Sequence, residues 1–163
     1  MSKPTSEKVK IREAIEADAE RIHEIQCDSV RKLCSAVYSP EIIDGWLKNR
    51  TPEGYLEGIR RGEMYTAELN RQIIGFGHAI LGEILATFVD PAYARRGVGM
   101  MLMRHGLKIA SVNTPRVIRL EATLNSRLFY EALGFKVVRE IKVRRGNVEI
   151  PALEMEIRGA DKI

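Results

Sequence analysis

Two hydrophobic periods alternate along this chain and predict strands and helices in turn. Short apolar or alternating runs, bounded by Gly, Pro or Asn, are typical of strands, whereas apolar residues at spacings of three and four indicate amphipathic helices. The predicted strands cover residues 8–12, 63–69, 72–81, 82–89, 117–123, 135–145 and 148–158. Asn70-Arg71 and Gly146-Asn147 predict tight hairpin turns between neighbouring strands.

Helices are expected between the first two strands. Apolar positions recur at helical spacing from residue 17 to about Tyr38, at Ile22, Ile25, Val30, Leu33 and Val37. His23 and Gln26 lie off this stripe, so we expect both on the surface. Ser39-Pro40 and Thr51-Pro52 are start signals for two further helices, because Ser or Thr caps the first turn and proline suits the first helical position.

The stretch 82–110 combines a strand, a glycine turn and a helix. Asp90-Pro91 ends the strand, Arg95-Arg96-Gly97-Val98-Gly99 forms a tight basic turn, and apolar residues from Val98 to Ile109 continue at helical spacing. The free N–H groups of a first helical turn bind anions, and glycine lets an anion approach the backbone. The stretch matches neither the dinucleotide-binding fingerprint nor a phosphate-binding P-loop. A plain strand-to-helix turn with two solvated arginines remains the alternative.

A second strand, 117–123, follows that helix, which predicts a parallel pair with a right-handed crossover. A short helix at 125–133 ends at Gly134, a residue typical of helix C-termini. The expected fold is therefore a single mixed α/β domain over residues 1–163. Its sheet is mostly antiparallel with one parallel pair and helices beside it, and residues 1–7 are expected to form a flexible tail.

Composition narrows the class of protein without naming a function. The chain has 163 residues, 45% apolar residues and a net charge of +4, and it contains no stretch of membrane-spanning length. Cys27 and Cys34 are seven apart on one predicted helix, about 10 Å along its axis, which is too far for a disulfide. We expect free thiols in a reducing cytoplasm, no metal site and no nucleic-acid partner, because a dense basic stripe with interleaved aromatics is missing.

Three features together resemble a known family. F-V-D-P precedes R-R-G-V-G, a helix follows, and N-S-R-L-F-Y-E-A-L-G-F comes about 25 residues later. This combination resembles the GNAT superfamily of acetyl-CoA-dependent N-acetyltransferases, whose cofactor motif is Q/R-x-x-G-x-G/A. Ala94 occupies the Gln/Arg position, which removes one side-chain contact of the family pattern. Tyr38-Ser39-Pro40 with Trp46 is also similar to a YafP-type bacterial subgroup.

The resemblance implies a role for each matched position. Phe88 and Val89 would bind the pantetheine arm through strand backbone groups, Asn125 would contact the same arm, and Tyr130 would lie beside the sulfur. The pyrophosphate would be held by Arg95, Arg96, Gly97, Val98, Gly99 and Met100. In the histone-acetylating branch a glutamate begins the equivalent strand, which makes Glu83 a candidate base.

Acetyl transfer needs a neutral amine, a donor for the oxyanion and a stabilised leaving thiolate. A tyrosine hydroxyl can donate to a departing thiolate, so Tyr130 is the candidate acid; packing against the sheet is its structural alternative. Glu83 shares a predicted strand face with apolar neighbours, which would raise its pKa, although it could equally face solvent at a strand end. Glu121 and His78 are the next candidates for the base. A backbone N–H near Val89 is the expected oxyanion donor.

The acceptor is expected to be a primary amine of a small molecule, attacking directly in a ternary complex. Tyr38 and Trp46 are candidate walls of its pocket, with core packing as the alternative for Trp46. The basic hairpin around Arg144 and Arg145 is typical of a solvated edge but could select an acidic acceptor. Acetylation of a protein N-terminus or lysine, and a non-catalytic acyl-CoA-binding module, stay open as rivals, as does a homodimer.

Overall fold

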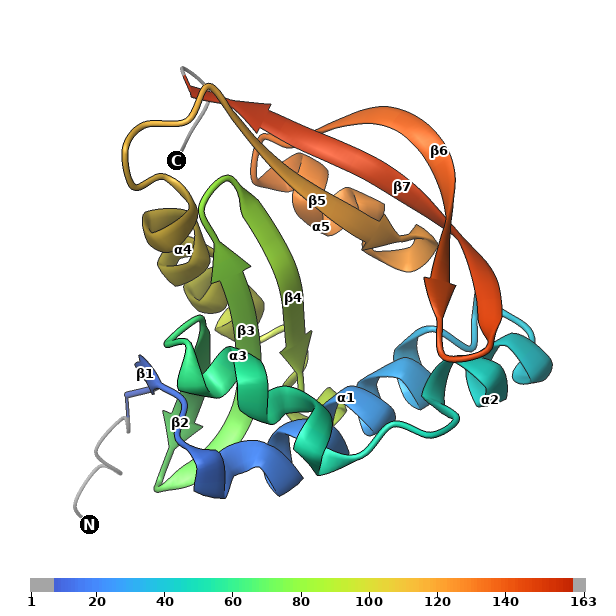
Figure 1. Ribbon diagram of the computed structural model, residues 1–163, viewed down its shortest axis with the longest axis horizontal. Coiled ribbons are helices and arrows are strands. Elements are labelled where there is room, and N and C mark those ends of the chain that lie inside the picture. Colours follow the sequence, from blue (N-terminus) through green and yellow to red (C-terminus); the bar gives the residue numbers. More distant parts are fainter. Residues whose placement is uncertain (1–7, 160–163) are drawn as a thin grey trace, which may run out of the picture.

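A seven-stranded sheet with the order β1-β2-β3-β4-β5-β7-β6 forms the frame of the molecule (Figure 1). The computed structural model describes residues 8–159, and the predicted tail at 1–7 lies outside the described residues. The strands are β1 (Lys10–Glu13), β2 (Met64–Leu69), β3 (Gln72–Ile80), β4 (Glu83–Val89), β5 (Val117–Thr123), β6 (Lys136–Arg145) and β7 (Val148–Arg158). The helices are α1 (Ala19–Leu33), α2 (Pro40–Leu47), α3 (Leu56–Arg60), α4 (Val98–Ala110) and α5 (Arg127–Ala132). The predicted mixed, mostly antiparallel sheet is confirmed.

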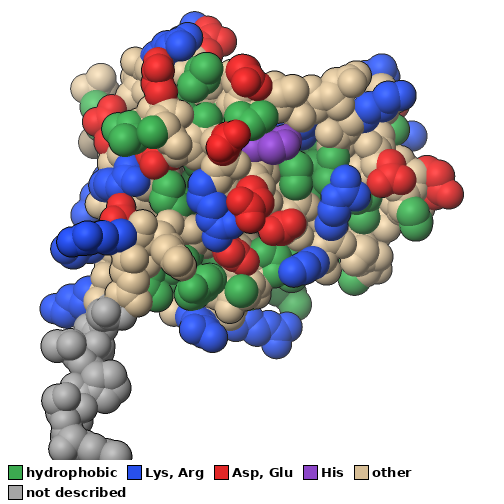
Figure 2. Space-filling view, turned by 90° about the horizontal axis from the view of Figure 1, so that it is seen from below, with side chains coloured by type: hydrophobic (Ala, Val, Ile, Leu, Met, Phe, Trp, Pro, Cys, Tyr) green, Lys and Arg blue, Asp and Glu red, His purple; other side chains and the backbone are tan. Residues whose placement is uncertain are grey.

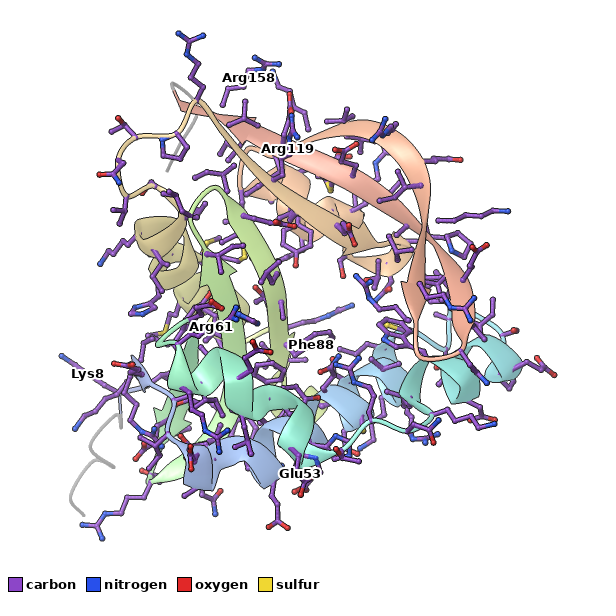
Figure 3. The ribbon with its side chains drawn as sticks, viewed as in Figure 1. Lys8, Glu53, Arg61, Phe88, Arg119 and Arg158 are labelled. Atoms are coloured by element: carbon purple, nitrogen blue, oxygen red, sulfur yellow. The ribbon has the colours of Figure 1, made fainter. Side chains whose placement is uncertain are left out.

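The parallel pair β4–β5 divides the sheet into two halves. These strands pair only at Glu83 with Arg119 and at Ile84 with Leu120, and every other strand pair is antiparallel and longer. Beyond Ile84 and Leu120 the two strands diverge, so that the sheet opens between them (Figure 1). Figure 3 labels Arg119 near the closed end of this opening and Phe88 near the open end.

Three hydrophobic clusters surround the opening. The largest packs α4 and α5 against one face of the sheet, with Leu102, Met103 and Phe135 almost fully buried. A second cluster joins α1 and α3 to the opposite face of β2 and β3. A third joins α2 to the β6–β7 hairpin. Phe88 packs against both the second and the third cluster, which places it between these two clusters.

Two glycines of β3 are explained by packing. The ring of Tyr65 on β2 lies over Gly77, where an added Cβ would come within 2.3 Å of it. The same tyrosine reaches Gly106 of α4, and Leu102 occupies the space over Gly75. The room that these glycines leave is therefore filled by the protein itself, which lets α4 approach the sheet closely.

The helical region differs from the predicted one in three places. Helix α1 ends at Leu33, not near Tyr38, and both Leu33 and Val37 are exposed. Gln26 is buried, contrary to the prediction of a surface position, because the segment after α2 covers this side of α1. The third predicted helix is a 3-10 turn (Pro52–Tyr55) followed by the short α3. The predicted cap at Ser39 is present, since its hydroxyl accepts the Ile42 N–H.

Candidate active site

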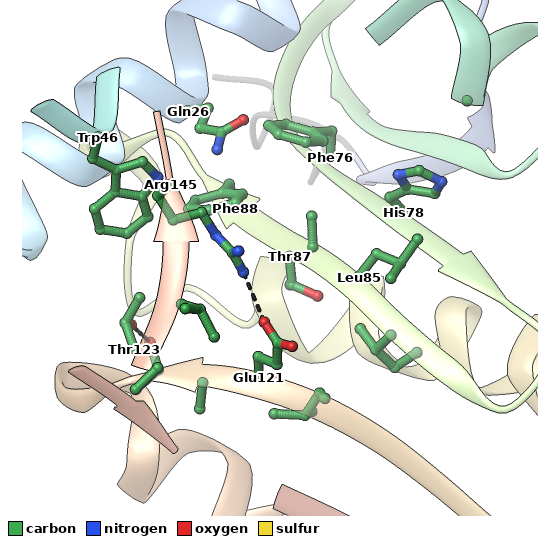
Figure 4. A pocket seen from close by; sticks show the side chains of 18 of the residues that line it. Gln26, Trp46, Phe76, His78, Leu85, Thr87, Phe88, Glu121, Thr123 and Arg145 are labelled. Carbon is green, nitrogen blue, oxygen red and sulfur yellow. Dashed lines mark hydrogen bonds and ion pairs between the residues drawn. The ribbon is translucent and has the colours of Figure 1, made fainter. Parts of the chain in front are cut away.

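A cavity of about 370 Å³ lies in the opening between β4 and β5. The diverging ends of these strands form its floor, α1, α2 and the segment around Tyr55 cover it, and the β6–β7 hairpin closes one side. Figure 4 shows the aromatic rings of Trp46, Phe76 and Phe88 together with polar groups from Gln26, His78 and Glu121. The wall thus combines aromatic rings with several convergent polar groups, which small-molecule sites use to orient a ligand.

One edge of β4 is open to the cavity. The Asp90 N–H donates to the Ile74 carbonyl of β3 at 2.8 Å, and Phe76 is the register partner of Phe88. Because backbone groups alternate in direction along a strand, those of Phe88 face β3, while those of Thr87 and Val89 face the opening. Phe88 itself presents its ring, which stacks on Phe76 at a centroid distance of 5.5 Å.

A β-bulge changes the predicted orientation of Glu83. The register between β3 and β4 shifts between His78 and Ala79, so that Leu85 is the extra residue. Strict alternation predicted that Glu83 shares a strand face with Thr87 and Val89. Because of the bulge, Glu83 pairs with Ile80 and lies on the opposite face of the strand. One inserted residue reverses every face beyond it.

Glu83 lines a second, neighbouring pocket beside Arg119 and Glu121. Its pKa is raised, first by burial and then by the negative charge of Glu121, while Arg119 acts in the opposite direction. Glu121 lines both this pocket and the main cavity. The two carboxyl groups therefore form a connected acidic pair, of which Glu121 reaches the main cavity.

Tyr130 of α5 lies in the wall of the main cavity and is 8% exposed. Burial raises the pKa of its hydroxyl to about 12, although a hydrogen bond with Thr87 of β4 lowers it in part. The phenol is therefore protonated near neutral pH. It can donate a hydrogen bond to a group lying between β4 and β5.

The basic turn before α4 has the geometry expected of an anion site. Gly97 is the N-cap residue, with φ at 84°, and no side chain caps this helix end. Its first-turn N–H groups are therefore available to a ligand. Gly99 packs on Phe129, where an added Cβ would lie 3.2 Å from the ring. Arg95 and Arg96 are exposed at this turn, and the Arg96 guanidinium lies 5.5 Å from the centre of the Tyr93 ring.

Asn125 and Tyr38 hold the segments around the cavity in place through hydrogen bonds. Asn125 lies in the 3-10 turn Leu124–Ser126 and hydrogen-bonds the thiol of the buried Cys34. The Tyr38 hydroxyl donates to the Pro151 carbonyl at 2.6 Å and accepts the Leu124 N–H at 3.0 Å. Tyr38 is not among the residues that line the cavity, whereas Trp46 is. Both Cys27 and Cys34 are free, as predicted.

Several polar residues of the cavity were not singled out from the sequence. The side-chain oxygen of Gln26 accepts the Tyr55 hydroxyl at 2.5 Å and an Arg50 N–H at 3.1 Å. These residues are far apart in sequence and carry no local motif, so only the folded chain could reveal the network. His78, one of the predicted base candidates, lies 3.2 Å from Glu63 and also lines the cavity.

The β6–β7 hairpin reaches the cavity because two glycines let it dock on α2. An added Cβ on Gly146 would lie 2.1 Å from the Gly45 carbonyl oxygen, and one on Gly45 would lie 2.2 Å from Val148. The Asn147 N–H donates to the same carbonyl at 3.2 Å. This contact brings Arg145 to Glu121, 3.0 Å away on β5 (Figure 4).

Within residues 8–159, no cluster of three or more His, Cys, Asp or Glu side chains could hold a metal ion. The helices of this range are also too short or too polar to cross a membrane.

On the face that carries α1–α3, acidic and basic side chains are intermingled (Figure 2).

Comparison with known proteins bears directly on this arrangement. Residues 34–158 match the family model of the acetyltransferase (GNAT) domain. The chain belongs to the GNAT acetyltransferase family. The uncharacterized N-acetyltransferase YafP of Escherichia coli is 29% identical over 135 residues, covering 83% of this chain and 86% of YafP. Both resemblances inferred from the sequence are thereby confirmed.

Solved structures agree with this GNAT protein in fold. A GCN5-related N-acetyltransferase from Rhodopseudomonas palustris superposes with a TM-score of 0.79 at 18% identity, covering 96% of this chain and 99% of the other. PaiA from Thermoplasma acidophilum, solved with coenzyme A, gives 0.74 at 24% identity, covering 93% and 99%. YncA from Salmonella typhimurium, solved with acetyl-CoA, gives 0.69 at 19% identity, covering 93% and 94%.

Proposed function

We propose that this GNAT protein transfers an acetyl group from acetyl-CoA to a primary amine of a small molecule, by direct attack in a ternary complex. The observation that carries the proposal is the continuity of the opening. A helix N-terminus without a side-chain cap adjoins the free edge of β4, and this edge leads to Tyr130 and the main cavity. The complexes of two structural relatives with coenzyme A and acetyl-CoA support the same choice of cosubstrate.

The features of the opening suit the chemistry of acetyl-CoA. The pyrophosphate is matched by the first-turn N–H groups of α4, with Arg95 and Arg96 nearby. The amide-containing pantetheine arm can pair with the open backbone of Val89 and Thr87 as an added strand would. Gly99 leaves the start of α4 close to Val89, so both contacts can be made by one extended ligand. Asn125 lies in the turn after β5, next to Ser126, which lines the main cavity.

Tyr130 is proposed to stabilise the leaving thiolate. When the amine nitrogen attacks the thioester carbon, the carbonyl electron pair moves to oxygen and then returns as the C–S bond breaks. The pKa of Tyr130 is about 12, whereas that of a thiol is about 8.5. Complete proton transfer would therefore be more than a thousandfold uphill. Tyr130 therefore keeps its proton and donates a hydrogen bond to the leaving thiolate, while the attacking nitrogen gives its proton to a base. A backbone N–H near Val89 is proposed as the oxyanion donor.

The base is proposed to be the acidic pair at the end of the cavity. Glu121 lines the main cavity, and Glu83 lines the neighbouring pocket to which Glu121 also belongs. The raised pKa of Glu83 makes it a better proton acceptor near neutral pH than an ordinary carboxylate. His78, next to Glu63, is the rival base on the opposite wall.

A thiol-release assay with acetyl-CoA and a panel of small amines and N-terminal peptides tests the proposal. We expect release that depends on a small amine, together with acetyl-CoA binding measured by calorimetry. Tight binding without release for any amine would instead indicate an acyl-CoA-binding regulatory protein. Release with peptides alone would indicate a protein acetyltransferase.

A further inference from the structure

An ion pair lies across the acceptor end of the main cavity. We propose that the acceptor is an amine that also carries a carboxylate, as amino acids do, and that its two charges replace the contact between Arg145 and Glu121. This inference rests on the proposed function and specifies its substrate class. It depends on the charges that line the cavity, on one buried donor and on the apolar wall between them.

The pair itself is easily exchanged. Arg145 comes from the end of β6 and Glu121 from β5, and their side chains are 34% and 41% exposed. An ion pair as exposed as this contributes little to stability, because water screens both charges. A ligand that presents a carboxylate to Arg145 and an ammonium group to Glu121 restores both interactions, so opening the pair costs little.

A second cation and a buried donor favour an anion beside Arg145. Arg50 also lines the cavity and contacts Gln26, which Figure 4 shows at the same end as Trp46 and Arg145. Trp46 is only 2% exposed, and its indole N–H has no hydrogen-bond partner among the described residues. A buried donor left unpaired is destabilising, and an incoming carboxylate oxygen can remove that cost by accepting its hydrogen bond. Two guanidinium groups and one indole N–H thus form a donor set for a carboxylate.

The remaining wall indicates the rest of the acceptor. Phe76 and Phe88 stack across the floor and suit an apolar body. A diamine would bring a second positive charge towards Arg50 and Arg145, which like-charge repulsion disfavours. Glu121 lines the cavity and can bind the ammonium group of the acceptor. The acceptor class that fits is an apolar amino acid, whose ammonium and carboxylate groups are separated by one carbon.

Matched sets of acceptors test the inference. L-phenylalanine, L-phenylalaninamide and 2-phenylethylamine share one body but differ in the carboxylate, and leucine supplies a second set. We expect kcat/KM in the thiol-release assay to be at least tenfold higher for the amino acid than for its two analogues. Arg145→Gln should remove that preference by lowering kcat/KM for the amino acid alone. Arg144→Gln is the matched control, because Arg144 is exposed on the same strand and does not line the cavity.

Trp46 gives a readout that does not require turnover. It is the only tryptophan of the chain, so its fluorescence reports on the cavity when amino acids are titrated in the presence of coenzyme A. The inference is supported by a saturable fluorescence change with L-phenylalanine. The affinity obtained from it should be at least tenfold weaker for L-phenylalaninamide, and for L-phenylalanine with the Arg145→Gln variant. Equal or tighter binding of the analogues overturns it, even if they are acetylated. Absence of thiol release with every amine defeats the proposed function instead, and the titration then still tests the carboxylate site.

Discussion

The two ends of the opening are built in opposite ways. The proposed cofactor end is one continuous stretch, in which strand β4, the basic turn and helix α4 follow each other within residues 83–110. The proposed acceptor end is assembled from α1, α2, β3, β5 and the β6–β7 hairpin, which are distant in sequence. Binding a shared cosubstrate requires backbone groups that any short motif can supply, whereas an acceptor pocket requires side chains brought together by tertiary packing. Variants can test whether the two ends act independently.

The largest effect is expected at the anion site. Gly97→Asp places a negative charge at the N-terminus of α4 and strains a position whose φ is 84°. Like charges at such a contact cost several kcal/mol, so acetyl-CoA affinity should fall about a thousandfold by calorimetry. Gly97→Asn is the control, because asparagine tolerates this backbone conformation without charge. If Gly97→Asp binds acetyl-CoA like the wild type, the phosphate assignment is wrong.

A smaller effect is expected between the two ends, at the sulfur. Tyr130→Phe removes one hydrogen-bond donor from the proposed leaving group, and loss of such a donor costs about a hundredfold in kcat. The acetyl-CoA dissociation constant should stay within about twofold, because the ring still packs against α4 and Phe135. Single-turnover thiol release separates this step from binding. Wild-type rates in the variant would remove Tyr130 from the mechanism.

A change in the β6–β7 hairpin should weaken acceptor binding without affecting acetyl-CoA binding. Gly146→Ala adds a Cβ that overlaps the Gly45 carbonyl, at a residue with φ of 55°. Strain and overlap together should lower the free energy of unfolding by about 2–4 kcal/mol, as measured by urea denaturation. Gly159→Ala is the control, since its Cβ would make only an ordinary contact at 3.9 Å. At temperatures where the variant is folded, acetyl-CoA affinity should be retained while the acceptor KM rises. A parallel loss of both would show that the two ends are coupled.

The smallest effect concerns stability and pH at Glu83. A carboxyl whose pKa is raised in the folded state binds its proton more tightly there than in the unfolded chain. The wild type therefore loses stability as pH rises through the unfolded and then the folded pKa of Glu83. Glu83→Gln should raise the melting temperature slightly at neutral pH, and the difference should vanish in acid, where Glu83 is protonated in both states. A constant difference at every pH would contradict burial beside Glu121 as the cause.

Features that depend on neighbouring residues could be predicted from the sequence, whereas features that depend on tertiary contacts could not. Period-two and helical patterns gave the bounds of β5 and β7 as observed, and those of the other strands to within about two residues, because local burial repeats within each element. The turn at Gly97 was readable because glycine and arginine are adjacent in sequence. Gln26 was misassigned because its burial comes from Tyr55 and Arg50, well beyond its own helix.

By itself, the sequence determined the family, the order of elements and the basic glycine turn before α4, since each depends on neighbouring residues. Only the tertiary structure decided the face on which Glu83 lies, because one bulge residue reverses strand alternation. It also decided that Arg145 meets Glu121, because two facing glycines let the hairpin dock on α2. The chemistry of the acceptor end depends on these long-range contacts, and such contacts leave no periodic signal in the chain.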